Sequence, residues 1–296
     1  MQTPSPVDRP SAWWLQTLQK RAVRMQDEVL DLSTPMTFAG ADERRAALKF
    51  FNAAFRAEES GLRQAHELAD EVSTWDPTLA DVLRLYGNEE GWHRELLTEF
   101  LGFLGGGVEP MGRVTRTLYG LYGRARRMET IVLTNLMFET IGSTTYRMAL
   151  ANVKQPAARQ MLTILTRDEA FHVPLNVHFM LRVLERKSGW ERLRLRALYQ
   201  LLFVSLVALP LASRPKAFAF DRISTAELAR AYARMLAALF AGRPELGLTP
   251  PRLLLWALGL RSRDANAEDA ISISSEAAER AAERDQVVVT ELRSAR

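Results

Sequence analysis

Apolar side chains recur at intervals of three and four along most of this chain, which is the spacing of amphipathic helices. The first long run predicts a helix from about Asp42 to Ser73. Its apolar positions are Leu48, Phe51, Phe55, Leu62 and Ala65. The strict alternation that is typical of strands is weak throughout. We therefore expect an all-α fold.

Helix-start and helix-stop signals divide the rest of the chain. Asp76 followed by Pro77 predicts a second helix, because an aspartate can cap a helix whose first position is proline. Three glycines after Leu104 predict its end. Further helices are expected over 129–153, 156–189, 190–212, 225–241 and 250–260, and the sequence from Ser224 to Glu227 is typical of a capping box.

Three segments are expected to lack stable helices. Residues 1–40 contain several prolines, residues 108–127 form a connector with five arginines, and residues 261–296 are polar. A transient helix over 275–284 is expected in this disordered tail. The predicted organisation is a helical bundle over 41–189, followed by a helical extension over 190–260 that packs on it.

Composition narrows the chemistry. The 296 residues include no cysteine, which excludes disulfides, iron–sulfur clusters and zinc–cysteine sites. The net charge of +4 suits a partner with an acidic surface, but an arginine-rich composition with no special partner is an equal alternative.

The apolar run Ala197–Ala212 is shorter than the roughly 20 residues that span a bilayer, and it contains Pro210. A buried helix is therefore favoured over an interfacial membrane contact. The first ten residues have no apolar core typical of a signal peptide, so a cytoplasmic location is expected.

The candidate chemistry lies around two of the four histidines. Each has a glutamate three residues earlier, in Glu90-Gly-Trp-His93 and in Glu169-Ala-Phe-His172. Positions i and i+3 share one face of a helix, about 5–6 Å apart at Cβ. A carboxylate and an imidazole at this spacing can bind one metal ion together.

The two pairs belong to a repeat. Glu59 precedes Glu90 by 31 residues, and Glu139 precedes Glu169 by 30. This spacing predicts two helix hairpins in tandem whose polar side chains meet at one level of a bundle. Glu58 competes with Glu59 for the first position. Glu59 is preferred because it follows Phe55 by four residues and precedes Leu62 by three.

Glu139 lies in a strongly apolar stretch, where an isolated buried carboxylate costs several kcal/mol. Four carboxylates would balance two divalent cations, and two neutral imidazoles would complete their ligands.

The pattern Glu, Glu-x-x-His, Glu, Glu-x-x-His resembles that of the ferritin-like di-iron carboxylate superfamily over about residues 45–185. The resemblance implies a ferritin-like four-helix bundle and two iron ions, with manganese or a mixed pair as alternatives. The implied ligands are Glu59, Glu90, His93, Glu139, Glu169 and His172.

The resemblance also implies roles for residues near the ligands. Asp168 would hydrogen-bond a ligand histidine from the facing helix, and Glu89 would do the same for His172. A solvated Asp168 paired with Arg167 is the alternative. Tyr146 and His66 each follow a first-position glutamate by seven residues and would lie near the metals, although His66 is equally expected to be a half-buried polar residue.

A substrate and O₂ pocket is expected beside the metals. Gly142 and Ser143 are small and would leave room there, and Trp92 and Phe138 would form its walls, unless they are ordinary core aromatics. A ribonucleotide reductase small subunit has a tyrosine at the position that is Leu97 here. An arylamine N-oxygenase has an extra histidine at the position that is Leu165 here.

The function implied is activation of O₂ to hydroxylate, desaturate or N-oxygenate a small molecule or a substrate held on an acyl or peptidyl carrier. Electrons would come from an external ferredoxin or reductase, since no flavin or nicotinamide motif is present. A homodimer is compatible with this interpretation, and a nucleic-acid partner is not expected. The alternatives are a di-metal peroxidase, a catalase or iron-handling protein, and a metal-free helical scaffold.

Overall fold

The computed structural model describes residues 6–111, 116, 120, 125–212 and 224–260. Within these ranges every regular element is helical, which confirms the predicted all-α class. The α-helices are α1 (Ser11–Met25), α2 (Ala41–Val72), α3 (Pro77–Phe103), α5 (Met128–Asn152), α6 (Pro156–Glu185), α7 (Gly189–Ala212), α9 (Thr225–Ala241) and α10 (Arg252–Ala257). Two short 3₁₀ turns are η1 (Pro6–Asp8) and η2 (Pro244–Leu246).

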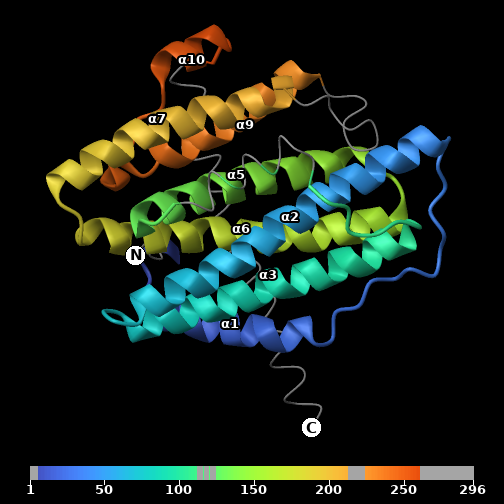
Figure 1. The fold of residues 1–296 in the computed structure, drawn as a ribbon, viewed down its shortest axis with the longest axis horizontal. Coiled ribbons are helices and arrows are strands. Elements are labelled where there is room, and N and C mark those ends of the chain that lie inside the picture. The colour runs from blue at the N-terminus through green and yellow to red at the C-terminus, as the bar shows by residue number, and fades with distance from the viewer. Residues whose placement is uncertain (1–5, 112–115, 117–119, 121–124, 213–223, 261–296) are drawn as a thin grey trace, which may run out of the picture.

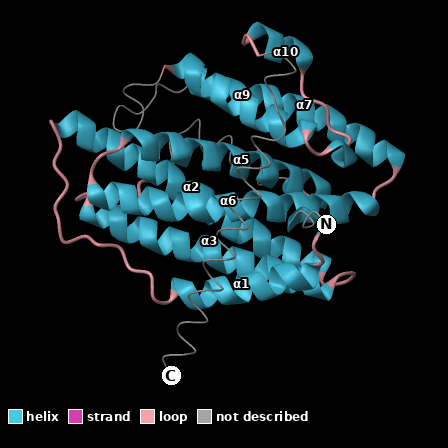
Figure 2. Ribbon diagram, turned by 180° about the vertical axis from the view of Figure 1, so that it is seen from behind, coloured by secondary structure: helices cyan, strands magenta, loops and turns pink. Residues whose placement is uncertain are grey.

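The long helices α2, α3, α5 and α6 lie side by side as two hairpins, α2 with α3 and α5 with α6 (Figure 1). Helix α1 packs on α3 at one edge of the molecule. Helices α7 and α9 pack on each other and on α5 at the opposite side, as the view from behind also shows (Figure 2). The hairpin pairs therefore occupy the middle of a layered helical bundle.

Both predicted boundary signals of α3 are confirmed. The Asp76 carboxylate accepts a hydrogen bond from the Leu79 amide at 3.0 Å, and Pro77 occupies the first helical position. At the other end, Gly105 has a φ of 72°, and the Gly106 amide donates to the Leu101 carbonyl at 3.0 Å. This left-handed C-terminal turn favours glycine, because a Cβ would be strained there.

The loose segment predicted for residues 1–40 is wrong over Ser11–Met25, which form α1. The prolines of this region lie outside the helix, and Pro10 immediately precedes it. Trp14 and Leu18 are fully buried, and the Trp14 ring packs edge-on against Phe171 of α6 at 5.2 Å. Most of the predicted connector and all of the tail, including 275–284, lie outside the described residues.

Candidate metal centre

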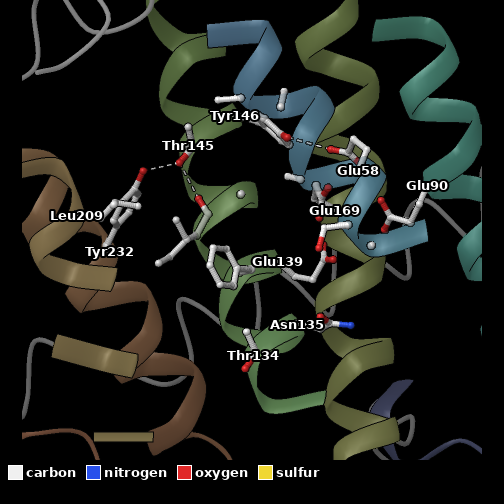
Figure 3. Close-up of a pocket in the computed structure, with 18 of the residues that line it drawn as sticks. Glu58, Glu90, Thr134, Asn135, Glu139, Thr145, Tyr146, Glu169, Leu209 and Tyr232 are labelled. Carbon is white, nitrogen blue, oxygen red and sulfur yellow. Dashed lines mark hydrogen bonds between the residues drawn. The ribbon is translucent and has the colours of Figure 1, made fainter. Parts of the chain in front are cut away.

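Side chains from all four central helices converge on one buried spot (Figure 3). Helix α2 contributes one carboxylate, α3 a carboxylate and an imidazole, α5 a carboxylate, and α6 a carboxylate and an imidazole. The residues are Glu58, Glu90, His93, Glu139, Glu169 and His172. Glu139 is the most open of them, with 12% of its side chain exposed.

The distances between these groups are those of potential ligands to shared cations. His93 Nδ1 lies 3.2 Å from Glu58 Oε2. His172 Nδ1 lies 3.2 Å from Glu90 Oε1, 3.7 Å from Glu169 Oε2 and 3.9 Å from Glu139 Oε2.

Two groups of candidate ligands follow from this arrangement. One combines Glu58, Glu90 and His93, and the other combines Glu90, Glu139 and His172, with ligand atoms within 4.8 Å of one another in each. Glu90 belongs to both groups. Its carboxylate is therefore placed to bridge two cations.

The structure places Glu58, and not the preferred Glu59, in this cluster. Glu58 is 1% exposed, whereas the Glu59 side chain is 40% exposed and pairs with Arg56 at 2.6 Å. Adjacent positions of a helix differ by about 100°, so only one of the two carboxylates can face the bundle. Phe51 and Ala65, seven residues before and after Glu58, are also buried. Their spacing is the signal in the sequence that could have identified Glu58 as the inward-facing glutamate.

Two buried tyrosines hold two of the carboxylates. Tyr146 donates to Glu58 Oε1 at 2.9 Å, so it lies beside the cluster. Tyr86 donates to Glu139 Oε1 at 2.6 Å, and its ring lies 4.8 Å from that of His172. Sequence reasoning missed Tyr86, although it precedes Glu90 by four residues and so shares its helix face.

Behind the histidines lies a second layer of carboxylates. His93 Nε2 lies 3.1 Å from Asp168 Oδ2 on α6, and His172 Nε2 lies 3.5 Å from Glu89 Oε1 on α3. Asp168 thus forms the expected hydrogen bond with His93, whereas Glu89 lies within ion-pair distance of His172 without forming a hydrogen bond to it. Such contacts fix the orientation of an imidazole and the nitrogen that it offers to a metal.

Arg21 of α1 joins these two acids. Its fully buried guanidinium donates to both oxygens of Glu89, with Nε at 3.1 Å from Oε2, and to Asp168 Oδ1 at 2.8 Å. Arg24 and Arg167 also contact Asp168, at 3.0 Å and 2.8 Å. Glu89, His93 and Asp168 form a third group of potential ligand atoms within 4.8 Å of one another, but arginines already pair with both of these acids.

The local charges set the protonation of the cluster. Burial raises the pKa of Glu90 and of Glu169 well above the ordinary value, and the neighbouring carboxylates raise it further. Burial alone would lower the pKa of His93, but its contacts with Asp168 and Glu58 raise it to about 9. These shifts favour the protonated forms of Glu90, Glu169 and His93.

The side chains fit a pair of divalent cations. Among the described residues, four buried atoms of the cluster have no hydrogen-bond partner, namely Glu90 Oε1, Glu169 Oε2, His172 Nδ1 and His172 Nε2. His172 Nδ1 and Glu90 Oε1 are close without the geometry of a hydrogen bond, as expected when both face a common third point. Four carboxylates and two imidazoles form the oxygen- and nitrogen-rich set that iron and manganese accept.

A cavity of about 270 Å³ adjoins the carboxylate side of the cluster. Glu58, Glu90, Glu139 and Glu169 line its end, whereas His93 and His172 are not among its lining residues (Figure 3). Its remaining walls are mostly apolar or small and come from α2, α5, α7 and α9. They include Phe50, Ala54, Ala57, Phe138, Ile141, Gly142, Leu209, Pro210, Leu228 and Tyr232.

The predicted pocket residues divide into two groups. Phe138 and Gly142 line the cavity, but Ser143 and Trp92 do not. Trp92 lies beside the ring of His93 at 5.3 Å. His66 is half-buried and lies against Gly87 of α3, where an added Cβ would be 3.0 Å from its ring.

Glycine also makes room at the cluster itself. A Cβ on Gly61 of α2 would lie 3.1 Å from the carboxylate carbon of Glu90. A side chain at this position would therefore crowd the group that is placed to bridge. Comparison with protein-family models, curated proteins and solved structures found no match to this chain.

Proposed function

We propose that this chain is a ferritin-like non-heme di-iron oxidoreductase that uses O₂ to hydroxylate, desaturate or N-oxygenate an apolar organic substrate. The observation that carries the proposal is the pair of ligand groups that share Glu90. Glu58 and His93 Nδ1 would hold one iron ion, and Glu139 and His172 Nδ1 the other, with Glu169 beside them. When bound, the metal pair supplies O₂ reduction chemistry that side chains alone lack.

The histidine side and the carboxylate side of the proposed centre would have different roles. On the histidine side, Arg21, Glu89 and Asp168 fill the space and hold both imidazoles. On the carboxylate side, Tyr86 and Tyr146 each fix one oxygen of a glutamate and leave the other facing the cluster. The carboxylate side is therefore where O₂ and substrate would enter.

The cavity favours an apolar substrate. Most of its walls away from the carboxylates are aliphatic, aromatic or small, although Gln64, Thr134, Asn135 and Thr145 also line it. A mostly apolar lining with a few polar groups suits an apolar ligand. Gly142 and Ala57 leave space for the substrate next to the cluster. An external electron donor completes the proposal, because each cycle of O₂ reduction needs electrons from outside the chain.

The first test compares two neighbouring glutamates. We would load the parent, Glu58→Gln and Glu59→Gln with Fe²⁺ under anaerobic conditions, and then measure iron by elemental analysis. The parent and Glu59→Gln are expected to bind two ions per chain, and Glu58→Gln fewer than two. Equal iron in all three proteins would refute the assignment of Glu58, and no bound iron in the parent would refute the centre.

The second test follows the reaction. The reduced, iron-loaded protein is mixed with O₂, and oxygen uptake, optical spectra and product mass are recorded with apolar candidate substrates and a chemical reductant. Uptake that depends on substrate and adds oxygen to it or removes hydrogen from it supports the proposal. Rapid consumption of hydrogen peroxide without product formation would instead favour a peroxidase or catalase.

A further inference from the structure

Helix α7 has an exposed apolar stripe along its outer face. At about 100° per residue, six positions fall within an arc of about 80°. They are Trp190, Leu193, Ala197, Leu201, Val204 and Ala208, and all six are exposed. Trp190 is 67% exposed and Leu201 is 64% exposed, so the stripe presents large apolar side chains to solvent over roughly 27 Å.

The opposite face of α7 is buried. Leu195, Tyr199 and Phe203 pack inward, and the Tyr199 ring lies 4.6 Å from that of Phe240 on α9. By length and composition, Gly189–Pro210 could cross a membrane. In its most apolar part 39% of the residues are buried, and these buried residues lie on one side of the helix. The predicted buried helix is therefore only half buried. A helix packed along one face can lie in a membrane surface, but lipid cannot surround it.

Helix α10 carries two further exposed apolar side chains. Leu253 is 85% exposed and Trp256 is 79% exposed. The segment before α10 is attached to α7, because Gln200 donates to the Thr249 carbonyl at 2.6 Å and Arg196 to the Gly247 carbonyl at 3.0 Å. Both views place α10 at the outer edge of the molecule, opposite α1 (Figures 1 and 2).

Basic side chains outnumber acidic ones in the two segments that carry this surface. Residues 186–212 include five basic side chains and one acidic one, and residues 246–260 include one basic and none acidic. Lys187 pairs with Glu129 at 2.9 Å and with Glu191 at 3.5 Å, and the acids just outside these segments, Glu185 and Glu245, pair with Arg182 and Arg243. Apolar side chains flanked by arginines and ending in tryptophans are typical of helices that lie at the interface of anionic bilayers.

We propose that the outer face of α7 and α10 binds the surface of a lipid bilayer that contains anionic headgroups. Helix α7 lies parallel to the membrane, with Trp190, Leu201 and Trp256 inserted and the exposed Arg194, about 20° from Leu201 around the helix, among the headgroups. A second copy of the chain fits this face less well, because a two-fold interface would bring the arginines of both copies together. The proposal is independent of metal binding.

Vesicle flotation with the full, metal-free chain tests the proposal. Vesicles of phosphatidylcholine alone are compared with vesicles that also contain phosphatidylglycerol. The parent is expected to float with the anionic vesicles and to be released at high salt. Leu201→Ser combined with Trp256→Ser is expected to weaken binding by roughly tenfold or more, because two exposed apolar side chains no longer insert.

The matched control is Val29→Ser, which removes a side chain that is 71% exposed in the segment that follows α1. This variant is expected to float like the parent. The proposal is overturned if the parent does not float with anionic vesicles, or if the control and the double variant lose binding equally. It is also overturned if sedimentation velocity shows a parent dimer that the double variant dissociates, because a second copy would then cover the face.

Discussion

Replacing Arg21 by methionine tests whether α1 is part of the candidate centre. The substitution keeps most of the side-chain length and removes the charge that contacts both Glu89 and Asp168. Asp168 retains Arg24 and Arg167, but Glu89 has both of its oxygens on Arg21. The substitution therefore leaves Glu89 as a buried carboxylate without its arginine partner.

The structure sets the expected magnitude. Arg21 and Asp168 are completely buried, and the Glu89 side chain is 2% exposed, so solvent screens the interaction very little. Burial alone would raise the pKa of Glu89, and the charge of Arg21 lowers it well below its usual range. Removing one partner of a buried ion pair costs about 3–5 kcal/mol of unfolding free energy. Loss of support for His172 is expected to weaken metal binding by roughly 10- to 100-fold.

Two measurements separate these effects. Urea unfolding of the metal-free protein gives the change in stability, and titration with Mn²⁺ or Fe²⁺ gives the change in affinity. Arg24→Met, on the same helix and with 14% of its side chain exposed, is the matched control and is expected to have smaller effects. In Arg21→Met with Glu89→Gln, part of the lost stability should return, because the buried charge has been removed.

The reasoning is refuted if Arg21→Met costs less than about 1 kcal/mol, since a buried pair of this kind would then contribute no more than a surface pair. It is also refuted if Arg24→Met and Arg21→Met change metal affinity equally. In that case α1 would stabilise the fold without supporting the histidines in particular.

Three further predictions concern other residues. Gly61→Ala should stabilise the metal-free helix by up to about 1 kcal/mol but weaken metal binding, because its Cβ crowds Glu90, whereas Gly102→Ala, with open space around it, should leave metal titrations unchanged. Gly142→Leu should fill the cavity, so that iron content measured by elemental analysis stays at the parent value while product formation falls by more than tenfold. His178 has its pKa lowered from 6.5, mainly by burial, so the unfolded chain binds its proton first as pH falls. Its contribution to stability is present above pH 6.5 and declines below it, and urea unfolding should show the parent losing its advantage over His178→Asn in that range.

Local signals predicted much of the fold. The cap at Asp76, the glycine turn at Gly105 and the capping box at Ser224 each act within one helix turn, and each is present. The two Glu-x-x-His pairs also needed only the pitch of a helix to place carboxylate and imidazole together. Interactions within a few residues of one another can be read directly from the order of side chains.

The remaining features depend on distant residues. Whether Glu58 or Glu59 faces the cluster depends on which side of α2 packs against α3. The spacing of Phe55 and Leu62 predicted the side that carries Glu59, which was wrong. Nothing near Arg21 in sequence indicates that it lies between Glu89 and Asp168, which are 68 and 147 residues away. Such contacts exist only once the helices have packed.

Arg21 contacts residues far along the chain, so these contacts can form only after those residues have been synthesised. Its helix is synthesised before the helices that it contacts, and Asp168 follows 147 residues later, which takes roughly 7–30 s at typical rates of synthesis. Until then the guanidinium has only part of its final surroundings, and a charged group is not buried without its partners. We therefore expect the N-terminal helix to dock late, closing over a hairpin pair that has already been translated.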